Sequence, residues 1–135
     1  MAVKICDLYK QPQYEEEVLT EVAVYNTLKA IQRHCIPQFM FAGYDGGLFV
    51  IVTEIGGFPL ELDMLSHEER LNIVNQLSCI HSYDILHNDI RLDNILMREF
   101  DGGFKTYFID FALSRRASRL EPSREMRKLE CLLNL

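Results

Sequence analysis

The stretch Ile85-Leu86-His87-Asn88-Asp89-Ile90-Arg91-Leu92-Asp93-Asn94-Ile95-Leu96 decides the fold of this chain, because a polar loop lies there between two apolar pairs. The flanking side chains favour burial and the loop residues do not, so we expect the loop to be held rigidly at the edge of a core. The segment Phe108-Ile109-Asp110-Phe111-Ala112 follows and adds a further carboxylate between apolar side chains. Rigidly held carboxylates beside an amide predict a metal or proton-transfer site.

The composition of the chain favours one soluble domain. It has 135 residues and a net charge of -6, and 48% of its residues are hydrophobic. This length suits one core, and the acidic balance argues against nucleic acid or an anionic membrane as partner. No stretch is apolar enough to cross a bilayer, and the N-terminus lacks the apolar region of a signal peptide. We expect a cytoplasmic protein whose cysteines are free thiols: Cys6, Cys35, Cys79 and Cys131.

The N-terminal part predicts a strand followed by a helix. Residues 2–6 alternate around Lys4, and residues 14–33 carry acidic residues at their start and an apolar stripe. Glu21 lies at the edge of that stripe, where a carboxylate needs a cation, and Lys4 is the nearest candidate in sequence. Taken singly, both side chains fit an ordinary solvated position better than a site.

A hairpin and a hinge are predicted next. Residues 38–42 and 48–53 form two strands around a loop at residues 43–47, and the second strand is continuously apolar and therefore central. Two glycines and a proline break regular structure at residues 53–59, where we place the hinge. A capping box at residues 66–69 then opens a helix with an expected apolar stripe at Leu71, Val74, Leu77 or Ser78, and His81.

The C-terminal part predicts a second hairpin, a loop and a helix. Residues 95–97 and 105–109 flank the turn signal Asp101-Gly102-Gly103, and this hairpin carries Asn94 at one end and Asp110 at the other. Residues 112–123 predict an exposed basic loop, and residues 124–135 a closing helix. Within the loop, Arg115-Arg116-Ala117-Ser118 matches a basic-directed phosphorylation pattern, but we favour a solvated basic loop.

The pattern H-x-D-x-x-x-x-N, followed after a short hairpin by D-F-A, resembles the catalytic loop and metal-binding motif of the protein-kinase-like superfamily. The chain is similar to compact fungal and microbial kinase-like proteins, truncated before the strand lysine and after the activation segment. The resemblance implies an α+β, two-lobed fold in a single kinase-like domain. Residues 1–57 form a reduced N-lobe of antiparallel sheet plus one helix, with the hinge, and residues 58–135 a minimal helical C-lobe with the catalytic loop.

The same resemblance implies roles for the two polar motifs. Asp89 orients the acceptor hydroxyl or takes its proton, and His87 braces the loop. Asn94 and Asp110 hold magnesium on the nucleotide phosphates, and Arg91 steadies the transferred phosphoryl group.

Nucleotide binding by the N-terminal part is also implied by the resemblance. Lys4 resembles the strand lysine that reaches the phosphates of ATP, and Glu21 resembles its helix partner. Glu54 and Gly56 lie in the segment that is similar to the hinge that receives the adenine.

The predicted function is an ATP- and Mg²⁺-dependent phosphotransferase acting on a hydroxyl. A protein serine or threonine is the first expected acceptor, and a small molecule the second. No glycine-rich loop precedes Lys4 and no Ala-Pro-Glu follows Asp110, which keeps open a pseudokinase or truncated binding module, with a possible partner chain. A metal-dependent hydrolase built on His87, Asp89 and Asp110 is a third reading, but it leaves Lys4 and Glu21 without roles.

Overall fold

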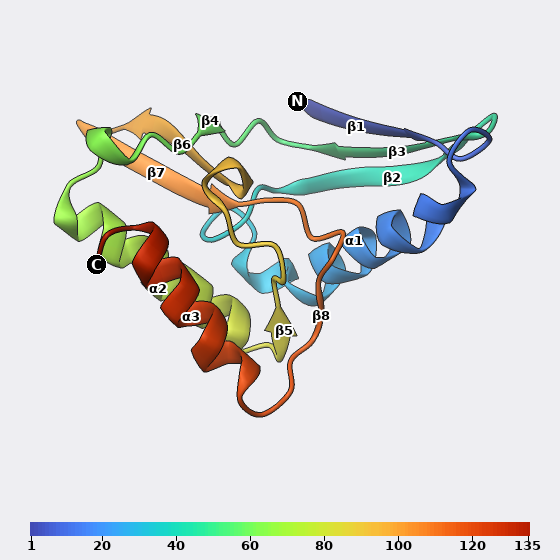
Figure 1. Cartoon of the computed structure of the whole chain (residues 1–135). Helices are drawn as coiled ribbons and strands as arrows, with labels where there is room; N and C mark the ends of the chain where they lie inside the picture. Colours follow the sequence, from blue (N-terminus) through green and yellow to red (C-terminus); the bar gives the residue numbers. More distant parts are fainter.

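The computed structural model describes residues 1–135 and has an α+β architecture of antiparallel sheets and three α-helices (Figure 1). The α+β class predicted from the sequence is confirmed. No helix in the structure is both long and apolar enough to span a membrane. The helices are α1 (Glu15–Thr27), α2 (His67–His81) and α3 (Glu121–Leu132), and the strands are β1 (Ala2–Asp7), β2 (Phe39–Asp45), β3 (Leu48–Thr53), β4 (Phe58–Pro59), β5 (Ile85–Leu86), β6 (Ile95–Phe100), β7 (Gly103–Phe108) and β8 (Arg115–Arg116).

The first sheet has the strand order β1-β3-β2, and β3 is central, as its continuously apolar sequence predicts. Helix α1 packs along one face of this sheet (Figure 1). Val18 of α1 contacts Phe49 and Ile51 of β3 in a small buried cluster. Strand β1 pairs only with β3, and the register sets Lys4 opposite Ile51, so that Lys4 lies on the same face as α1.

Both hairpins have shorter turns than the sequence suggested. The predicted loop at residues 43–47 is wrong, because only Gly46 and Gly47 form the turn, with φ of 57° and 82°. Asp101 and Gly102, with φ of 50° and 80°, form the second turn in the same way. Two successive left-handed residues match the twist of paired strands, so β2 and β6 continue farther than expected.

Helix α1 is shorter than predicted, ending at Thr27 instead of residue 33. Leu28 has ψ of 19°, and the chain continues into a single 3₁₀ turn, Lys29–Ile31. The side-chain amide of Gln32 then donates to the main-chain oxygen of Tyr25 at 3.0 Å. This bond satisfies one of the carbonyl groups left free at the helix end, and the chain turns back into β2.

Helix α2 begins with the predicted capping box. The Ser66 hydroxyl accepts from the Glu69 amide at 3.1 Å, and a Glu69 carboxylate oxygen accepts from the Ser66 amide at 2.9 Å. The predicted apolar stripe is wrong at Leu71, which is 43% exposed. The buried face instead consists of Ile73, Gln76, Leu77 and Ile80.

The buried amide of Gln76 explains why the stripe was misplaced. Its nitrogen donates to the main-chain oxygens of His34 and Thr106 at 2.8 and 2.9 Å, and its oxygen accepts from the Thr106 hydroxyl at 2.8 Å. A polar residue with all these partners can occupy a core position at little cost. Hydrophobic periodicity alone does not reveal such a position.

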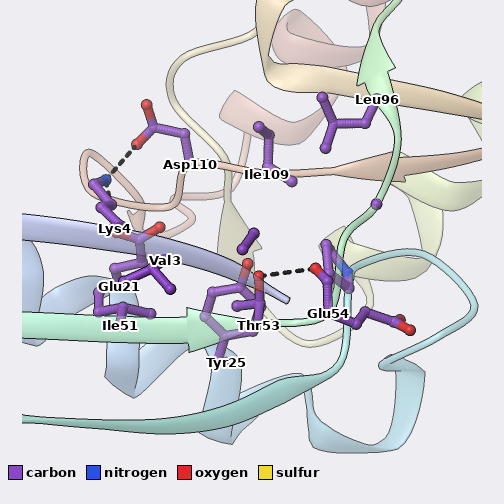
Figure 2. Close-up of a pocket in the computed structure, with 13 residues that line it drawn as sticks. Val3, Lys4, Glu21, Tyr25, Ile51, Thr53, Glu54, Leu96, Ile109 and Asp110 are labelled. Carbon is purple, nitrogen blue, oxygen red and sulfur yellow. Dashed lines mark hydrogen bonds and ion pairs between the residues drawn. The ribbon is translucent and has the colours of Figure 1, made fainter.

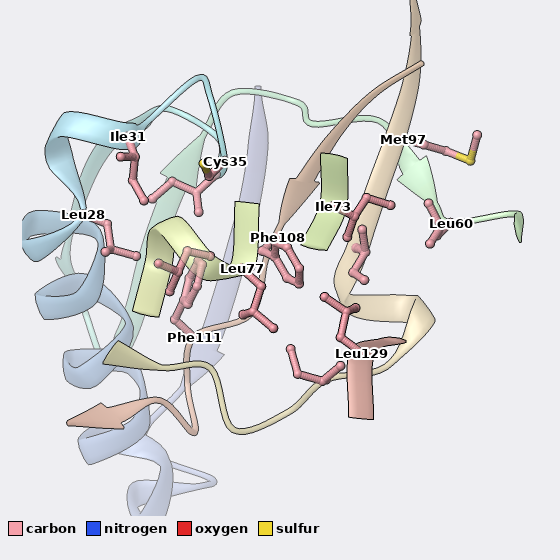
Figure 3. Packing of buried hydrophobic residues seen from close by; sticks show 14 of the residues in the cluster. Leu28, Ile31, Cys35, Leu60, Ile73, Leu77, Met97, Phe108, Phe111 and Leu129 are labelled. Atoms are coloured by element: carbon pink, nitrogen blue, oxygen red, sulfur yellow. The ribbon is translucent and has the colours of Figure 1, made fainter. Parts of the chain in front are cut away.

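The main hydrophobic core draws on both halves of the chain (Figure 3). Leu28 follows α1, Ile73 lies on α2, Phe108 ends β7 and Leu129 lies on α3, and all four side chains are fully buried. Residues before and after the hinge therefore share one core.

The segment between β7 and α3 is more ordered than the predicted exposed loop. Arg115 and Arg116 form β8, which pairs antiparallel with β5, directly before residue 87. Helix α3 begins at Glu121, three residues earlier than predicted, with Pro122 in its first turn, where the missing N–H costs nothing.

Candidate active site

A cleft of about 270 Å³ lies between the first sheet on one side and Leu96, Ile109 and Asp110 on the other (Figure 2). Five residues predicted to form the site line it: Lys4, Glu21, Glu54, Gly56 and Asp110. They come from β1, α1, the hinge and the segment after β7. The remaining lining residues are Ala2, Val3, Tyr25, Pro37, Ile51, Thr53, Leu96 and Ile109.

Lys4 lies between two carboxylates. Its ammonium nitrogen donates to Glu21 Oε2 at 2.8 Å and lies 3.6 Å from Asp110 Oδ1. Partial burial on its own lowers the pKa of Lys4, but the two carboxylates outweigh this effect and the net pKa is raised. The side chain therefore keeps its positive charge beside the cleft.

Glu21 is only 4% exposed, although its sequence position fits a solvated helix residue. Burial raises the pKa of the Glu21 carboxyl, and the Lys4 ammonium opposes that rise. Burying one carboxylate against one cation is costly, so the pair is weak evidence for stability and better evidence for a site.

His87 fastens the polar loop to the segment that carries Asp110. The imidazole is fully buried, its Nε2 donates to the Ile109 carbonyl at 2.8 Å, and its Nδ1 accepts from the Asp89 amide at 3.2 Å. These contacts require the neutral ring with the proton on Nε2. Burial lowers the pKa of His87, in agreement with that state.

Asn94 connects the loop residues to one another. Its amide nitrogen donates to Asp89 Oδ2 and to the Asp89 main-chain oxygen, both at 2.9 Å. Its main-chain oxygen accepts from the Ile109 amide at 3.0 Å, which places Asn94 next to the residue before Asp110. Because the Asn94 side-chain nitrogen donates both hydrogen bonds to Asp89, the Asn94 Oδ1 atom is left free to bind a ligand.

Arg91 has a looser position than the other loop residues. Its side chain is 58% exposed, and its Nε lies 3.7 Å from Asp89 Oδ1. Neither Arg91 nor His87, Asp89 or Asn94 lines the cleft. The structure therefore divides the predicted residues into a cleft group and a loop group, and Ile109 contacts the loop group while lining the cleft.

Asp110 has a left-handed backbone, with φ of 65°. This conformation is costly for a residue with a Cβ atom and is concentrated at functional sites. The Ala112 amide donates weakly to Asp110 Oδ1 at 3.4 Å, and Lys4 approaches the same oxygen. The second oxygen, Oδ2, has no protein partner.

Asn94 and Asp110 supply oxygen atoms of the type that magnesium binds. No three His, Cys, Asp or Glu side chains are grouped closely enough to hold a metal ion by themselves. Magnesium takes hard oxygen ligands, and in nucleotide sites the protein commonly supplies one or two of them while phosphates and waters complete the shell. The donor set therefore suits a shared ion better than an all-protein metal centre.

Hydrogen bonds and close packing hold the hinge residues in place. Glu54 is held by Gln38: the Glu54 amide donates to the Gln38 carbonyl at 3.0 Å, and the Gln38 amide donates to Glu54 Oε1 at 2.9 Å. A Cβ atom on Gly56 would lie 3.0 Å from the Leu96 side chain. The close packing around Gly56 thus limits the cleft at its hinge end.

Glu125 of α3 is a site residue that sequence reasoning missed. One carboxylate oxygen binds His81 Nε2 at 2.8 Å and the His87 amide at 3.0 Å, and the other accepts from the Asn88 amide at 2.7 Å. Burial raises the pKa of Glu125, but these hydrogen bonds outweigh burial and the net pKa is lowered. Its spacing of four residues before the buried Leu129 was the available signal.

No protein-family model matches this chain. Assignment of a function therefore depends on the residues and contacts described above.

Proposed function

We propose that this chain is a protein-kinase-like phosphotransferase that moves the γ-phosphate of ATP to a hydroxyl, most favourably that of a protein serine or threonine, with Mg²⁺. The observation that carries the proposal is the row Glu21–Lys4–Asp110, which joins a buried carboxylate to a strained, partly exposed one through a single ammonium. Phosphoryl transfer depends mainly on positioning and charge neutralisation, and this row offers both.

The cleft supports nucleotide binding through its two kinds of wall. Val3, Ile51 and Leu96 offer apolar surface for a flat aromatic base. Lys4 offers a positive charge for the phosphates, and its contact with Glu21 fixes the direction of the ammonium. When bound, magnesium neutralises phosphate charge, and Asn94 Oδ1 and the Asp110 carboxylate are the protein atoms that would hold it.

Asp89 is the residue proposed to receive the acceptor hydroxyl. Its Oδ2 is fixed by the Asn94 amide, while its side chain keeps 25% of its surface exposed. In the reaction the hydroxyl oxygen forms a bond to the γ-phosphorus, the bond from that phosphorus to the bridging oxygen breaks, and ADP leaves. Asp89 orients the hydroxyl and takes its proton.

Two observations favour a second candidate, a binding module with little transferase activity. The Lys4 side chain is 45% exposed, and no strand pairs with β1 on the side away from β3. The phosphate end of the cleft is therefore open to water, which weakens electrostatic catalysis. The hydrolase reading has less support, because both ring nitrogens of His87 already have protein partners.

The test compares phosphate transfer from ATP by the native chain, Asp89→Asn and Asp93→Asn, using a mixed serine/threonine peptide library and magnesium. Asp93 is an exposed carboxylate in the same loop and serves as the matched control. We expect Asp89→Asn to lower kcat by about 100-fold or more with ATP affinity retained, and Asp93→Asn to match the native chain. Equal transfer by the native chain and Asp89→Asn would overturn the proposal, and ATP binding without transfer would favour the binding module.

A further inference from the structure

Strand β1 leaves one of its two edges unpaired. The first sheet has the order β1-β3-β2, so β1 pairs with β3 on one side and with no strand on the other (Figure 1). The Leu8 amide donates to the Gly47 carbonyl at 3.0 Å, on the side of β3, and the backbone groups of successive strand residues point to opposite sides. The N–H and C=O groups of Val3 and Ile5 therefore point away from β3 and have no strand partner.

No feature of β1 protects this edge. Folded proteins commonly protect exposed edges with proline, a bulge or a free charge. Strand β1 has no proline and an unbroken register with β3, and its two charged side chains are occupied: Lys4 binds Glu21, and Asp7 accepts from the amides of the following turn. The opposite edge of the sheet differs, because the register of β2 shifts between Phe39 and Phe41. Strand β1 is thus the edge that can accept a further strand.

The face of the sheet that turns away from α1 is apolar beside this edge. Val3 lies opposite Val52, Ile5 lies opposite Val50, and Phe41 of β2 continues the row beyond Val52. Val3, Ile5 and Phe41 are exposed, although such side chains favour burial. A strand added to β1 therefore brings cross-strand neighbours to Val3 and Ile5 as well as partners for their backbone groups.

We propose that a second copy of this chain occupies the edge, and that the two β1 strands pair antiparallel about a two-fold axis. A two-fold axis brings identical groups together, so one unpaired edge serves both partners. An axis at Lys4 sets two ammonium groups against each other. An axis at Ile5 instead sets Ile5 against Ile5, and Lys4 against Cys6 of the partner copy. The geometry therefore favours the axis at Ile5, and the two three-stranded sheets become one continuous sheet of two copies.

The charges in β1 permit this contact. The chain has a net charge of -6, but β1 contains one lysine and one aspartate, so the paired strands have no net charge between them. The contact is small, because it involves one strand from each copy and the side chains beside it. We therefore expect a reversible dimer whose amount depends on the protein concentration.

The pairing also covers the open end of the cleft. Ala2, Val3 and Lys4 of β1 line the cleft, and Lys4 lies at its proposed phosphate end. A second β1 beside this strand shields Lys4 from water, which strengthens its attraction for phosphate oxygens. This consequence rests on the proposed function, but the pairing does not, because the dimer forms without nucleotide.

Sedimentation equilibrium of the full chain, without nucleotide and from about 1 µM to about 500 µM, tests the pairing. The chain has a mass of 15.8 kDa, and we expect the average mass to rise toward twice that value as the concentration increases. Ile5→Lys sets two ammonium groups face to face at the axis, so we expect it to raise the dissociation constant by at least about tenfold. A native chain that stays monomeric over the whole range would overturn the proposal.

Phe41→Lys is the matched control, because Phe41 is 57% exposed, compared with 61% for Ile5, and lies on the same face of the sheet at its other edge. We expect this variant to dimerise like the native chain. Equal loss of the dimer in both variants would show that the apolar faces stack, and would refute pairing at the edge.

Hydrogen exchange followed by NMR tests the edge without any substitution. In the dimer the amides of Val3 and Ile5 donate to the partner copy, so we expect their exchange to slow by at least about threefold between about 20 µM and about 500 µM protein. The amides of Lys4 and Cys6 face β3 in the single copy and should change less. No change at Val3 and Ile5, or the same change at all four amides, would contradict the pairing.

Discussion

Replacing Glu125 with glutamine tests how firmly α3 supports the polar loop. The native carboxylate accepts three hydrogen bonds, from the His81 ring and from the amides of His87 and Asn88, at 2.7 to 3.0 Å. Glutamine has nearly the same size, but one of its terminal atoms is an NH₂ group that cannot accept. Whichever way the amide lies, the N–H of His87 or of Asn88 then loses its acceptor.

The expected cost is about 3–4 kcal/mol. An unpaired buried N–H costs about 1–3 kcal/mol, and the bonds that remain lose the roughly twofold strength that a charged acceptor gives them. This loss is a large part of a typical stability of about 5–15 kcal/mol. Urea unfolding should therefore show a clearly lower midpoint for Glu125→Gln.

Glu130→Gln is the matched control, because Glu130 lies on the same helix and its side chain makes no hydrogen bond or ion pair in the structure. We expect this control to remain within about 0.5 kcal/mol of the native chain. If Glu125→Gln unfolds at the same urea concentration as the control, Glu125 does not hold the loop and the reasoning is refuted.

Two further predictions concern the hinge and the brace of the loop. Gly57→Ala should lower the free energy of unfolding by about 2 kcal/mol or more, because Gly57 has φ of 128° and an added Cβ atom would lie 2.2 Å from the Met97 carbonyl oxygen. Urea unfolding compares this variant with Gly43→Ala, where an added Cβ atom meets nothing within 4 Å. Equal stability of the two variants would be inconsistent with the structure. The pKa of His87 should stay below about 6.5 in an NMR titration, because burial disfavours its charged form. Since the unfolded chain then binds more protons than the folded one, the His87 contribution should lower stability as the pH falls below about 6.5, and a His87 that titrates at or above that value would contradict the assignment.

Local signals in the sequence predicted most of the elements. Strand β1, both hairpins and the capping box of α2 depend on neighbouring residues, and all appear in the structure. Turn lengths and the end of α1 were misjudged, because a two-residue turn or a side chain such as Gln32 changes the boundary without changing the hydrophobic pattern. These details depend on backbone angles that composition does not specify.

Long-range contacts were the harder part. Lys4 and Glu21 each suit a solvated position, and only the pairing of β1 with β3 and the packing of α1 bring their charged atoms to 2.8 Å. Gln76 and Glu125 were missed, because a buried polar residue is satisfied by partners far along the chain. The pairing of Lys4 with Glu21 was expected from the resemblance at the motifs, but the support of the loop by α3 was not.

Calorimetric titration with ATP tests the central claim most directly, since the cleft around Lys4 is proposed to bind nucleotide with magnesium. The native chain, Lys4→Met and Lys10→Met are compared with and without Mg²⁺. Lys10 is an exposed lysine whose side chain makes no hydrogen bond or ion pair. We predict magnesium-dependent binding by the native chain and Lys10→Met, and an affinity at least about tenfold lower, or about 1.4 kcal/mol, for Lys4→Met. Equal affinity in Lys4→Met, or no binding by the native chain in the presence of magnesium, would contradict the account.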